Sequence, residues 1–199
     1  MSKALSSQNI SVLILAGGRA RRMNGVDKGF VELNGKPMIR HILDNLGSGF
    51  KQIMISTNHV NAAYRGLGCD LIADKLTGSL GPLAGIHAGL CEAKTKLVFV
   101  VPCDTPYISK EVCQRLYHAL ETEGGLMAVA HDGQRLHATV AVIDVSVREK
   151  LEHYLLHGGR RMMSWYKEQA AIEVDCADLK PSFININTLT ELERLQQKE

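Results

Sequence analysis

Apolar runs of strand length alternate along this chain with longer segments in which apolar residues recur at helical spacing. This alternation predicts a largely parallel sheet that carries helices on both of its faces. The runs expected to form strands are residues 11–15, 52–57, 70–73, 97–101, 126–130, 138–143 and 171–174. The predicted fold class is therefore α/β, with three layers and a mostly parallel central sheet.

The segments between these runs carry the helix signals. Apolar residues spaced by three and four predict helices with one buried face at residues 38–46, 83–90, 112–120 and 147–155. A further helix is predicted after Thr188, because Thr188 and Glu191 have the spacing of a capping box. The polar link at residues 131–134 is short enough for a hairpin, so we expect one antiparallel strand in the sheet.

Composition limits the domain count and the class of partner. With 199 residues, of which 45% are hydrophobic, the chain is predicted to form a single domain over residues 1–199, with residues 1–9 as a flexible N-terminus. The 23 basic and 21 acidic residues nearly balance, which favours a small anionic partner over nucleic acid. Five cysteines without a CxxC pair are typical of a reduced intracellular protein. Because no stretch resembles a signal peptide or a membrane span, we expect a cytoplasmic protein without membrane contact.

The segment LAGGRARRMNGVDK, at residues 15–28, joins an apolar strand to a glycine turn and a basic loop. Gly17 and Gly18 allow a sharp turn and a close backbone approach to a ligand. The loop cations repel one another unless solvent or a polyanion screens them, which favours a nucleoside triphosphate as ligand. These cations are Arg19, Arg21, Arg22 and Lys28. Neither a P-loop nor a GxGxxG fingerprint is present, and an ordinary α/β turn beside a solvated basic face remains the alternative.

Asp104 follows the most apolar strand candidate, residues 97–101, and lies between Pro102 and Pro106. Ligands of open α/β sheets bind at the carboxyl ends of the strands, so this carboxylate is the candidate metal ligand. One aspartate suffices for Mg²⁺ when a triphosphate supplies the other ligands. The alternative is that Asp104 caps the next turn, or the helix that begins near Ser109.

Several short motifs extend this pattern along the chain. They are LAGG at 15–18, Arg22-Met23, Asp27-Lys28, Asn34-Gly35-Lys36-Pro37, Asp74, Gly81-Pro82-Leu83-Ala84-Gly85, Pro102-Cys103-Asp104-Thr105-Pro106 and Asn185-Ile186-Asn187-Thr188. In type and order they resemble the molybdenum cofactor guanylyltransferases, the MobA family, over nearly the whole chain. The resemblance implies a Rossmann-like nucleotidyltransferase fold. Asn24 stands where the family usually has glycine, and because asparagine tolerates positive φ we expect the turn to be kept.

The resemblance also implies an activity and a set of site residues. The activity is transfer of GMP from GTP to Mo-molybdopterin with release of pyrophosphate, with Mg²⁺ as cofactor and with molybdoenzymes and their chaperones as further partners. The implied catalytic residues are Arg22, Lys28 and Asp104, with Asp104 as the metal ligand. The residues implied to bind nucleotide or cofactor are Leu15, Ala16, Gly17, Gly18, Lys28, Ser56, Asp74, Gly81, Asp104, Asn185 and Asn187.

Individual positions carry more specific expectations. Gly17-Gly18 resembles the guanine-using form of the opening motif, and the small residues Gly81, Ala84 and Gly85 are expected to leave room for a purine. Asn185 and Asn187, two residues apart, are expected to face one polar ligand on the pterin side, with turn formation and helix capping as the alternative. Gly89 is expected to pack against the sheet, and Cys103 to be small packing near the site.

The implied chemistry needs no general base. The second pKa of a phosphate monoester is about 6, so an acceptor phosphate is already largely ionised at neutral pH. Arg22 and Lys28 are expected to neutralise the leaving pyrophosphate. Two alternatives stay open: a sugar-1-phosphate nucleotidyltransferase, although residues 19–21 do not reproduce the usual Gly-Thr-Arg turn, and a non-catalytic molybdopterin carrier.

Overall fold

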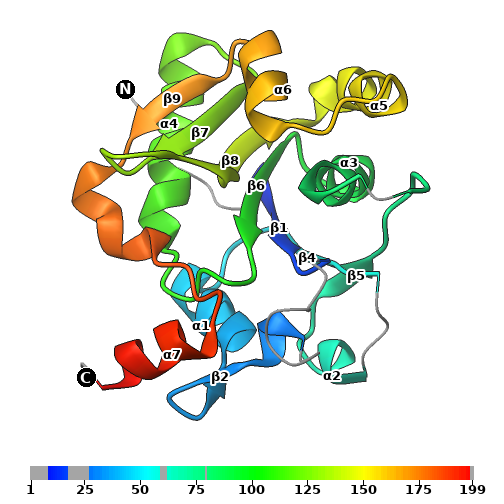
Figure 1. The fold of residues 1–199 in the computed structure, drawn as a ribbon. Helices are drawn as coiled ribbons and strands as arrows, with labels where there is room; N and C mark the ends of the chain where they lie inside the picture. Colours follow the sequence, from blue (N-terminus) through cyan, green and yellow to red (C-terminus); the bar gives the residue numbers. More distant parts are fainter. Residues whose placement is uncertain (1–8, 18–26, 59–61, 79, 198–199) are drawn as a thin grey trace.

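A seven-stranded sheet forms the centre of the protein in the computed structural model, which describes residues 9–17, 27–58, 62–78 and 80–197 (Figure 1). The strands lie in the order β5-β4-β1-β6-β8-β7-β9. Their bounds are β1 (Ile10–Leu15), β4 (Gln52–Ser56), β5 (Asp70–Ile72), β6 (Leu97–Pro102), β7 (Met127–His131), β8 (Leu136–Asp144) and β9 (Ile172–Asp175). All seven predicted strands are confirmed, with ends that differ from the predicted ones by one or two residues.

The sheet is parallel except at β8. Strand β1 pairs in parallel with β4 and β6, β4 with β5, and β7 with β9, whereas β8 is antiparallel to both β6 and β7. The predicted hairpin joins β7 to β8, and Asp132 N donates to Arg135 O at 3.1 Å across its turn. The prediction of a mostly parallel sheet with one antiparallel strand is therefore confirmed.

Helices cover both faces of the sheet, as predicted (Figure 1). One face packs against α1 (Met38–Leu46) and α4 (Lys110–Glu123), and the other against α3 (Pro82–Glu92), α5 (Arg148–Leu156) and α6 (Met162–Glu168). Strand β1 contributes Ile10, Val12 and Ile14 to the first core and Leu13 to the second. A strand buried on both faces needs no polar alternation, which explains why β1 is apolar at every position except Ser11, which is itself buried.

Some elements differ from the sequence prediction or are absent from it. Helix α5 begins at Arg148, because Val147 belongs to a short 3-10 turn, η3 (Val145–Val147). The short helices α2 (Ala62–Arg65) and α6 span too few residues to show a clear period, and neither was predicted. The expected flexible N-terminus falls almost entirely on residues 1–8, outside the described residues.

A third, smaller core lies beside the main sheet. The antiparallel pair β2 (Glu32–Leu33) and β3 (Lys36–Pro37) turns through Asn34 and Gly35, both at positive φ, and packs against α7 (Leu189–Gln196). The buried residues of this small core are Val31, Leu33, Met38, Ile186 and Leu192. The predicted capping box begins α7: Glu191 N donates to Thr188 Oγ1 at 3.2 Å and Thr188 N donates to Glu191 Oε2 at 3.0 Å.

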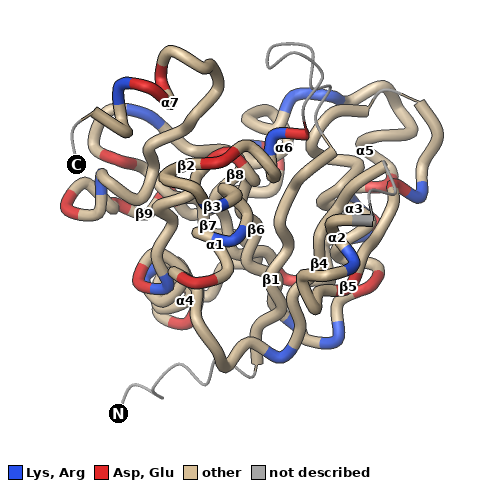
Figure 2. Tube along the Cα trace, turned by 90° about the horizontal axis from the view of Figure 1, so that it is seen from below, with Lys and Arg blue, Asp and Glu red and all other residues tan. Residues whose placement is uncertain are grey.

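Charged residues of both signs are interspersed around the described part of the chain (Figure 2). This distribution agrees with the near balance of 23 basic and 21 acidic residues. Within the described residues, no helix is both long enough and apolar enough to cross a membrane.

Candidate functional site

The carboxyl ends of β1, β4 and β6 meet at one edge of the sheet. Backbone bonds fasten them there: Ala16 N donates to Ser56 O at 2.8 Å, and Cys103 N donates to Leu15 O at 3.0 Å. Gly17 follows as an exposed residue, and the nearest described atom to a Cβ built on it is the Ser56 carbonyl oxygen, at 3.9 Å. As far as the described residues extend, nothing therefore blocks a ligand from approaching the backbone of Gly17.

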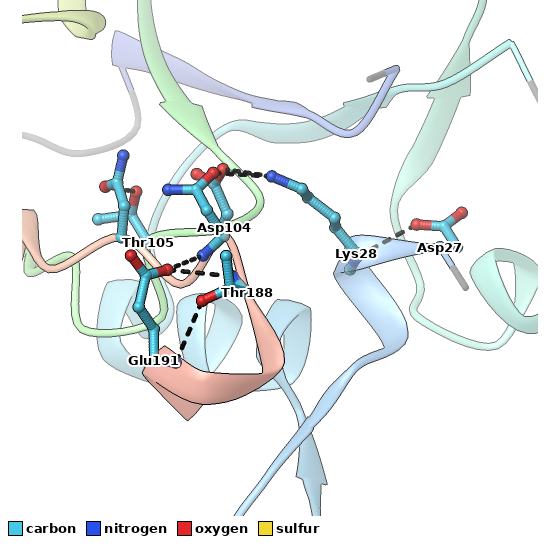
Figure 3. A network of polar contacts seen from close by, with 9 residues as sticks. Asp27, Lys28, Asp104, Thr105, Thr188 and Glu191 are labelled. Atoms are coloured by element: carbon cyan, nitrogen blue, oxygen red, sulfur yellow. Dashed lines mark hydrogen bonds and ion pairs between the residues drawn. The ribbon is translucent and has the colours of Figure 1, made fainter. Parts of the chain in front are cut away.

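Lys28 and Asp104 face each other beside this turn (Figure 3). Lys28 Nζ donates to Asp104 Oδ2 at 3.2 Å and to Asn187 Oδ1 at 2.9 Å. The other carboxylate oxygen, Asp104 Oδ1, is buried and has no hydrogen-bond partner among the described residues. The alternative that Asp104 caps the following turn or helix is wrong, since its carboxylate bonds Lys28 and Ser109 stands as the N-cap of α4.

A buried network fixes the start of the Lys28 segment. Lys28 opens a 3-10 turn, η2 (Lys28–Phe30), whose N-cap is Asp27. Asp27 Oδ1 accepts from Gly29 N at 3.1 Å and from the hydroxyl of Tyr64 at 2.7 Å. Tyr64 is fully buried, and burial together with its bond to Asp27 raises its pKa far above the ordinary value. The phenol is therefore a permanent donor that holds Asp27 in place.

The segment that carries Asn187 is fixed by the capping box of α7. Asn187 N donates to Glu191 Oε2 at 2.7 Å. The same carboxylate accepts from the backbone N of Thr188, and Figure 3 shows Thr188 and Glu191 side by side. These backbone bonds, that from Asn187 first, lower the pKa of Glu191. The capping carboxylate is therefore ionised at neutral pH and holds the backbone N–H of Asn187 in place.

Asn185 has a different partner. Its Oδ1 accepts from the hydroxyl of buried Thr105 at 2.9 Å, while Ile186 N donates to Asp104 O at 2.9 Å. The segment before α7 is thus fastened to the loop after β6 by one side chain and one backbone bond. The two asparagines contact different elements, and their joint use for one ligand stays a prediction.

Asp74 lies on the opposite side of the glycine turn, beyond the ends of β4 and β5. Its Oδ2 accepts from Asn58 Nδ2 at 2.7 Å, and its backbone N donates to Asn58 Oδ1 at 3.1 Å. With the strand order β5-β4-β1-β6, Asp74 and Asp104 flank the turn after β1. Asn58 was missed by the sequence analysis, because nothing local distinguishes it from an ordinary loop asparagine.

Helix α3 corrects the prediction for the purine. Ala84 is 1% exposed, and a Cβ on Gly85 would lie 2.6 Å from Ser56 Oγ, so both residues pack against the sheet and leave no room for a base. Gly81 differs: its φ is +69°, and no atom of the described residues lies within 4 Å of a Cβ built on it. The packing predicted for Gly89 is confirmed, since a Cβ there would lie 2.5 Å from Leu13 Cδ2.

Other predicted positions are either inert or undescribed. Burial raises the pKa of the Cys103 thiol to about 12, with nearby Asp104 adding to the effect, so Cys103 is a protonated packing residue. Arg22, Gly18 and Asn24 lie outside the described residues. Among the residues that are described, no three His, Cys, Asp or Glu side chains are grouped to hold a metal ion. The metal-ligand role of Asp104 stays a prediction.

Known proteins resemble this chain over most of its length. The family model of the MobA-like NTP transferase domain matches residues 12–172. A molybdenum cofactor guanylyltransferase from Shewanella putrefaciens is 42% identical over 183 residues, covering 92% of this chain and 94% of the relative. Another from Histophilus somni is 38% identical over 187 residues, covering 94% and 96%. The crystal structure of molybdopterin-guanine dinucleotide biosynthesis protein A from Archaeoglobus fulgidus has a TM-score of 0.79 at 26% identity, covering 94% of this chain and 97% of that one. The chain belongs to the MobA-like NTP transferase family.

Proposed function

We propose that this protein is a molybdenum cofactor guanylyltransferase, which transfers GMP from GTP to Mo-molybdopterin and releases pyrophosphate. The relatives that share 42% and 38% of its sequence carry that name, and they are matched over more than nine-tenths of their length. The observation that carries the proposal is the placement of Lys28 and Asp104, 3.2 Å apart, beside the exposed turn at Gly17. A cation, a carboxylate and free backbone at one strand edge suit a triphosphate.

The reaction exchanges one phosphorus–oxygen bond for another. An oxygen of the acceptor's terminal phosphate bonds the α-phosphorus of GTP, and the bond from that phosphorus to the bridging oxygen breaks as pyrophosphate leaves. The acceptor phosphate is already ionised, so the protein's task is to align the reactants and to stabilise the developing charge. Lys28 would meet the leaving pyrophosphate, and Arg22 is proposed for the same side.

The residues at Asp104 fit a divalent cation. Asp104 Oδ1 is a buried carboxylate oxygen without a hydrogen-bond partner in the described part of the chain, and hard cations such as Mg²⁺ prefer such ligands. We propose that Asp104 holds Mg²⁺ together with phosphate oxygens of GTP. A bound Mg²⁺ would neutralise charge on those oxygens. Lys28 shares the Asp104 carboxylate through Oδ2, and so stands next to the same phosphates.

Recognition of guanine is assigned to the turn after β1. The proposed contacts are backbone groups of Leu15, Ala16 and Gly17 at the strand end. Gly81 is the N-cap of α3, and no described atom lies within 4 Å of a Cβ built on it. Ser56 and Asp74 line the neighbouring strand ends. The pterin side is proposed for Asn185, and the product would pass to molybdoenzymes and their chaperones in the cytoplasm.

A direct assay tests the proposal. The purified protein is incubated with Mo-molybdopterin, Mg²⁺ and each nucleoside triphosphate in turn, and release of pyrophosphate is followed. Release with GTP, and formation of the guanine dinucleotide, is expected. Release only when a sugar 1-phosphate replaces the pterin would favour a sugar-1-phosphate nucleotidyltransferase. Binding of molybdopterin without any release would favour a carrier.

A further inference from the structure

We propose that Asn187 is a positioning residue for Lys28, and that it serves the nucleotide half of the site through that lysine instead of touching the pterin. The inference rests on the proposed function for the identity of the anion that Lys28 meets. Its basis is one contact between distant segments: Lys28 Nζ donates to Asn187 Oδ1 at 2.9 Å across 159 positions of sequence.

The two acceptors of the Lys28 ammonium differ in kind. Asp104 is charged and lies at 3.2 Å, whereas Asn187 is neutral and lies at 2.9 Å. A lysine ammonium has three donors on a flexible stem, so two fixed oxygens still leave one N–H for a ligand. Without Asn187, Asp104 is the partner that the Lys28 ammonium keeps among the described residues, and its carboxylate draws the ammonium away from a phosphate. The neutral amide therefore orients the charge without cancelling it.

Asn187 is itself held, so the contact is preformed. Its backbone N–H is bound by Glu191 Oε2 at 2.7 Å, directly before the capped start of α7. The small core formed by Val31, Leu33, Met38, Ile186 and Leu192 joins the strand pair that follows Lys28 to the segment that contains Asn187. The lysine and its amide partner therefore belong to one packed unit. Replacing the Asn187 side chain removes a group that bonds Lys28 directly.

Asn185 supplies the matched comparison. It lies two residues earlier on the same segment and is also half-buried, yet its Oδ1 accepts from Thr105 and not from Lys28. A general disturbance of the segment would affect both asparagines alike. A role through Lys28 belongs to Asn187 alone.

The test is a double-mutant cycle of Asn187 and Lys28. Titration calorimetry measures the affinity of each variant for pyrophosphate, so the test does not depend on catalytic turnover. Asn187→Ala is expected to weaken binding about tenfold, the size of one hydrogen bond to a charged group. In a Lys28→Met background the same change is expected to have no further effect, because its partner is gone. The cycle built with Asn185→Ala is expected to be additive. Additivity of Asn187→Ala with Lys28→Met would overturn the inference.

Steady-state kinetics separates this inference from the proposed function. Asn187→Ala is expected to raise KM for GTP and to leave KM for the molybdopterin acceptor unchanged, whereas the reverse pattern would make Asn187 a pterin ligand and overturn the inference. Coupling between Asn187 and Lys28 in pyrophosphate binding, without guanylyl transfer by the wild type, would contradict the proposed function alone. Guanylyl transfer without that coupling would contradict the inference alone.

Discussion

Replacing Tyr64 by phenylalanine removes one hydroxyl from the network that supports Lys28. The hydroxyl donates to Asp27 Oδ1 at 2.7 Å from a fully buried ring. Without this hydroxyl, the bond that Asp27 Oδ1 keeps among the described residues is the one from Gly29 N, at 3.1 Å. Tyr64→Phe adds no atoms and leaves the ring contact with Phe30 possible, at a centroid distance of 4.6 Å. The change therefore isolates one hydrogen bond to a carboxylate.

The expected cost follows from the charge on the acceptor. A hydrogen bond to an ionised group contributes about 2 kcal/mol, against about 1 kcal/mol for a neutral pair. With a urea m-value of about 2 kcal/mol/M, the unfolding midpoint should fall by about 1 M. The melting temperature should fall by about 4–8 °C for a chain of this length. Urea unfolding followed by circular dichroism measures the first quantity, and calorimetry the second.

Tyr166 provides the matched control. Its hydroxyl also donates at 2.7 Å, but to the neutral carbonyl oxygen of Ala138, and its side chain is likewise buried. Tyr166→Phe should cost about 1 kcal/mol, roughly half the loss in Tyr64→Phe. Equal losses in the two variants, or a loss below about 0.5 kcal/mol in Tyr64→Phe, would refute the claim that the charged bond to Asp27 holds this network.

Three further predictions concern the helices. Gly89→Ala places a Cβ 2.5 Å from Leu13 Cδ2, so overpacking should outweigh the gain in helix propensity. The free energy of unfolding, measured by urea unfolding, should fall by about 1 kcal/mol. A stabilised variant would contradict close packing of Gly89 on the sheet. Burial lowers the pKa of His87 from the ordinary 6.5, so on acidification the unfolded chain binds a proton at a higher pH than the folded chain. The free energy of unfolding should therefore fall as the pH drops below about 6.5, and should fall less steeply in His87→Gln. Identical pH dependence of the free energy of unfolding in the two proteins would show that His87 is not its source. Thr188→Ala removes the hydroxyl that accepts from Glu191 N at 3.2 Å, and should cost about 1 kcal/mol, whereas Thr188→Ser should keep most of it.

The sheet could be predicted because its signals are local. Strand β1 carries five apolar residues and a single polar one, Ser11, and is buried on both faces. Thr188 with Glu191 forms a capping box within four residues. Asp104 could be predicted to lie at the same edge of the sheet as the end of β1, because strand ends in a parallel sheet share one edge. What the local pattern did not show was the β2–β3 pair, whose strands are two residues each and have no alternation to detect.

The side-chain contacts of the site depended on tertiary structure. Lys28 meets Asn187 across 159 positions, Tyr64 meets Asp27 across 37, and Asn58 meets Asp74 across 16. Spacing and propensity carry no information on such pairs, since each is set by where the fold brings two loops together. The prediction that Gly85 leaves room for a purine failed for the same reason. Small residues in α3 can make room either for a ligand or for a neighbouring strand, and the position of Ser56 shows that Gly85 packs against a strand.

Guanylyl transfer by an Asp104→Ala variant tests the account most directly. The wild type and the variant are compared for pyrophosphate release from GTP with Mo-molybdopterin and Mg²⁺, after urea unfolding has shown that both are folded. Because Asp104 both pairs with Lys28 and offers the buried oxygen proposed for the cation, the rate should fall by at least about 100-fold. A variant that releases pyrophosphate at close to the wild-type rate would show that the reaction does not depend on this carboxylate.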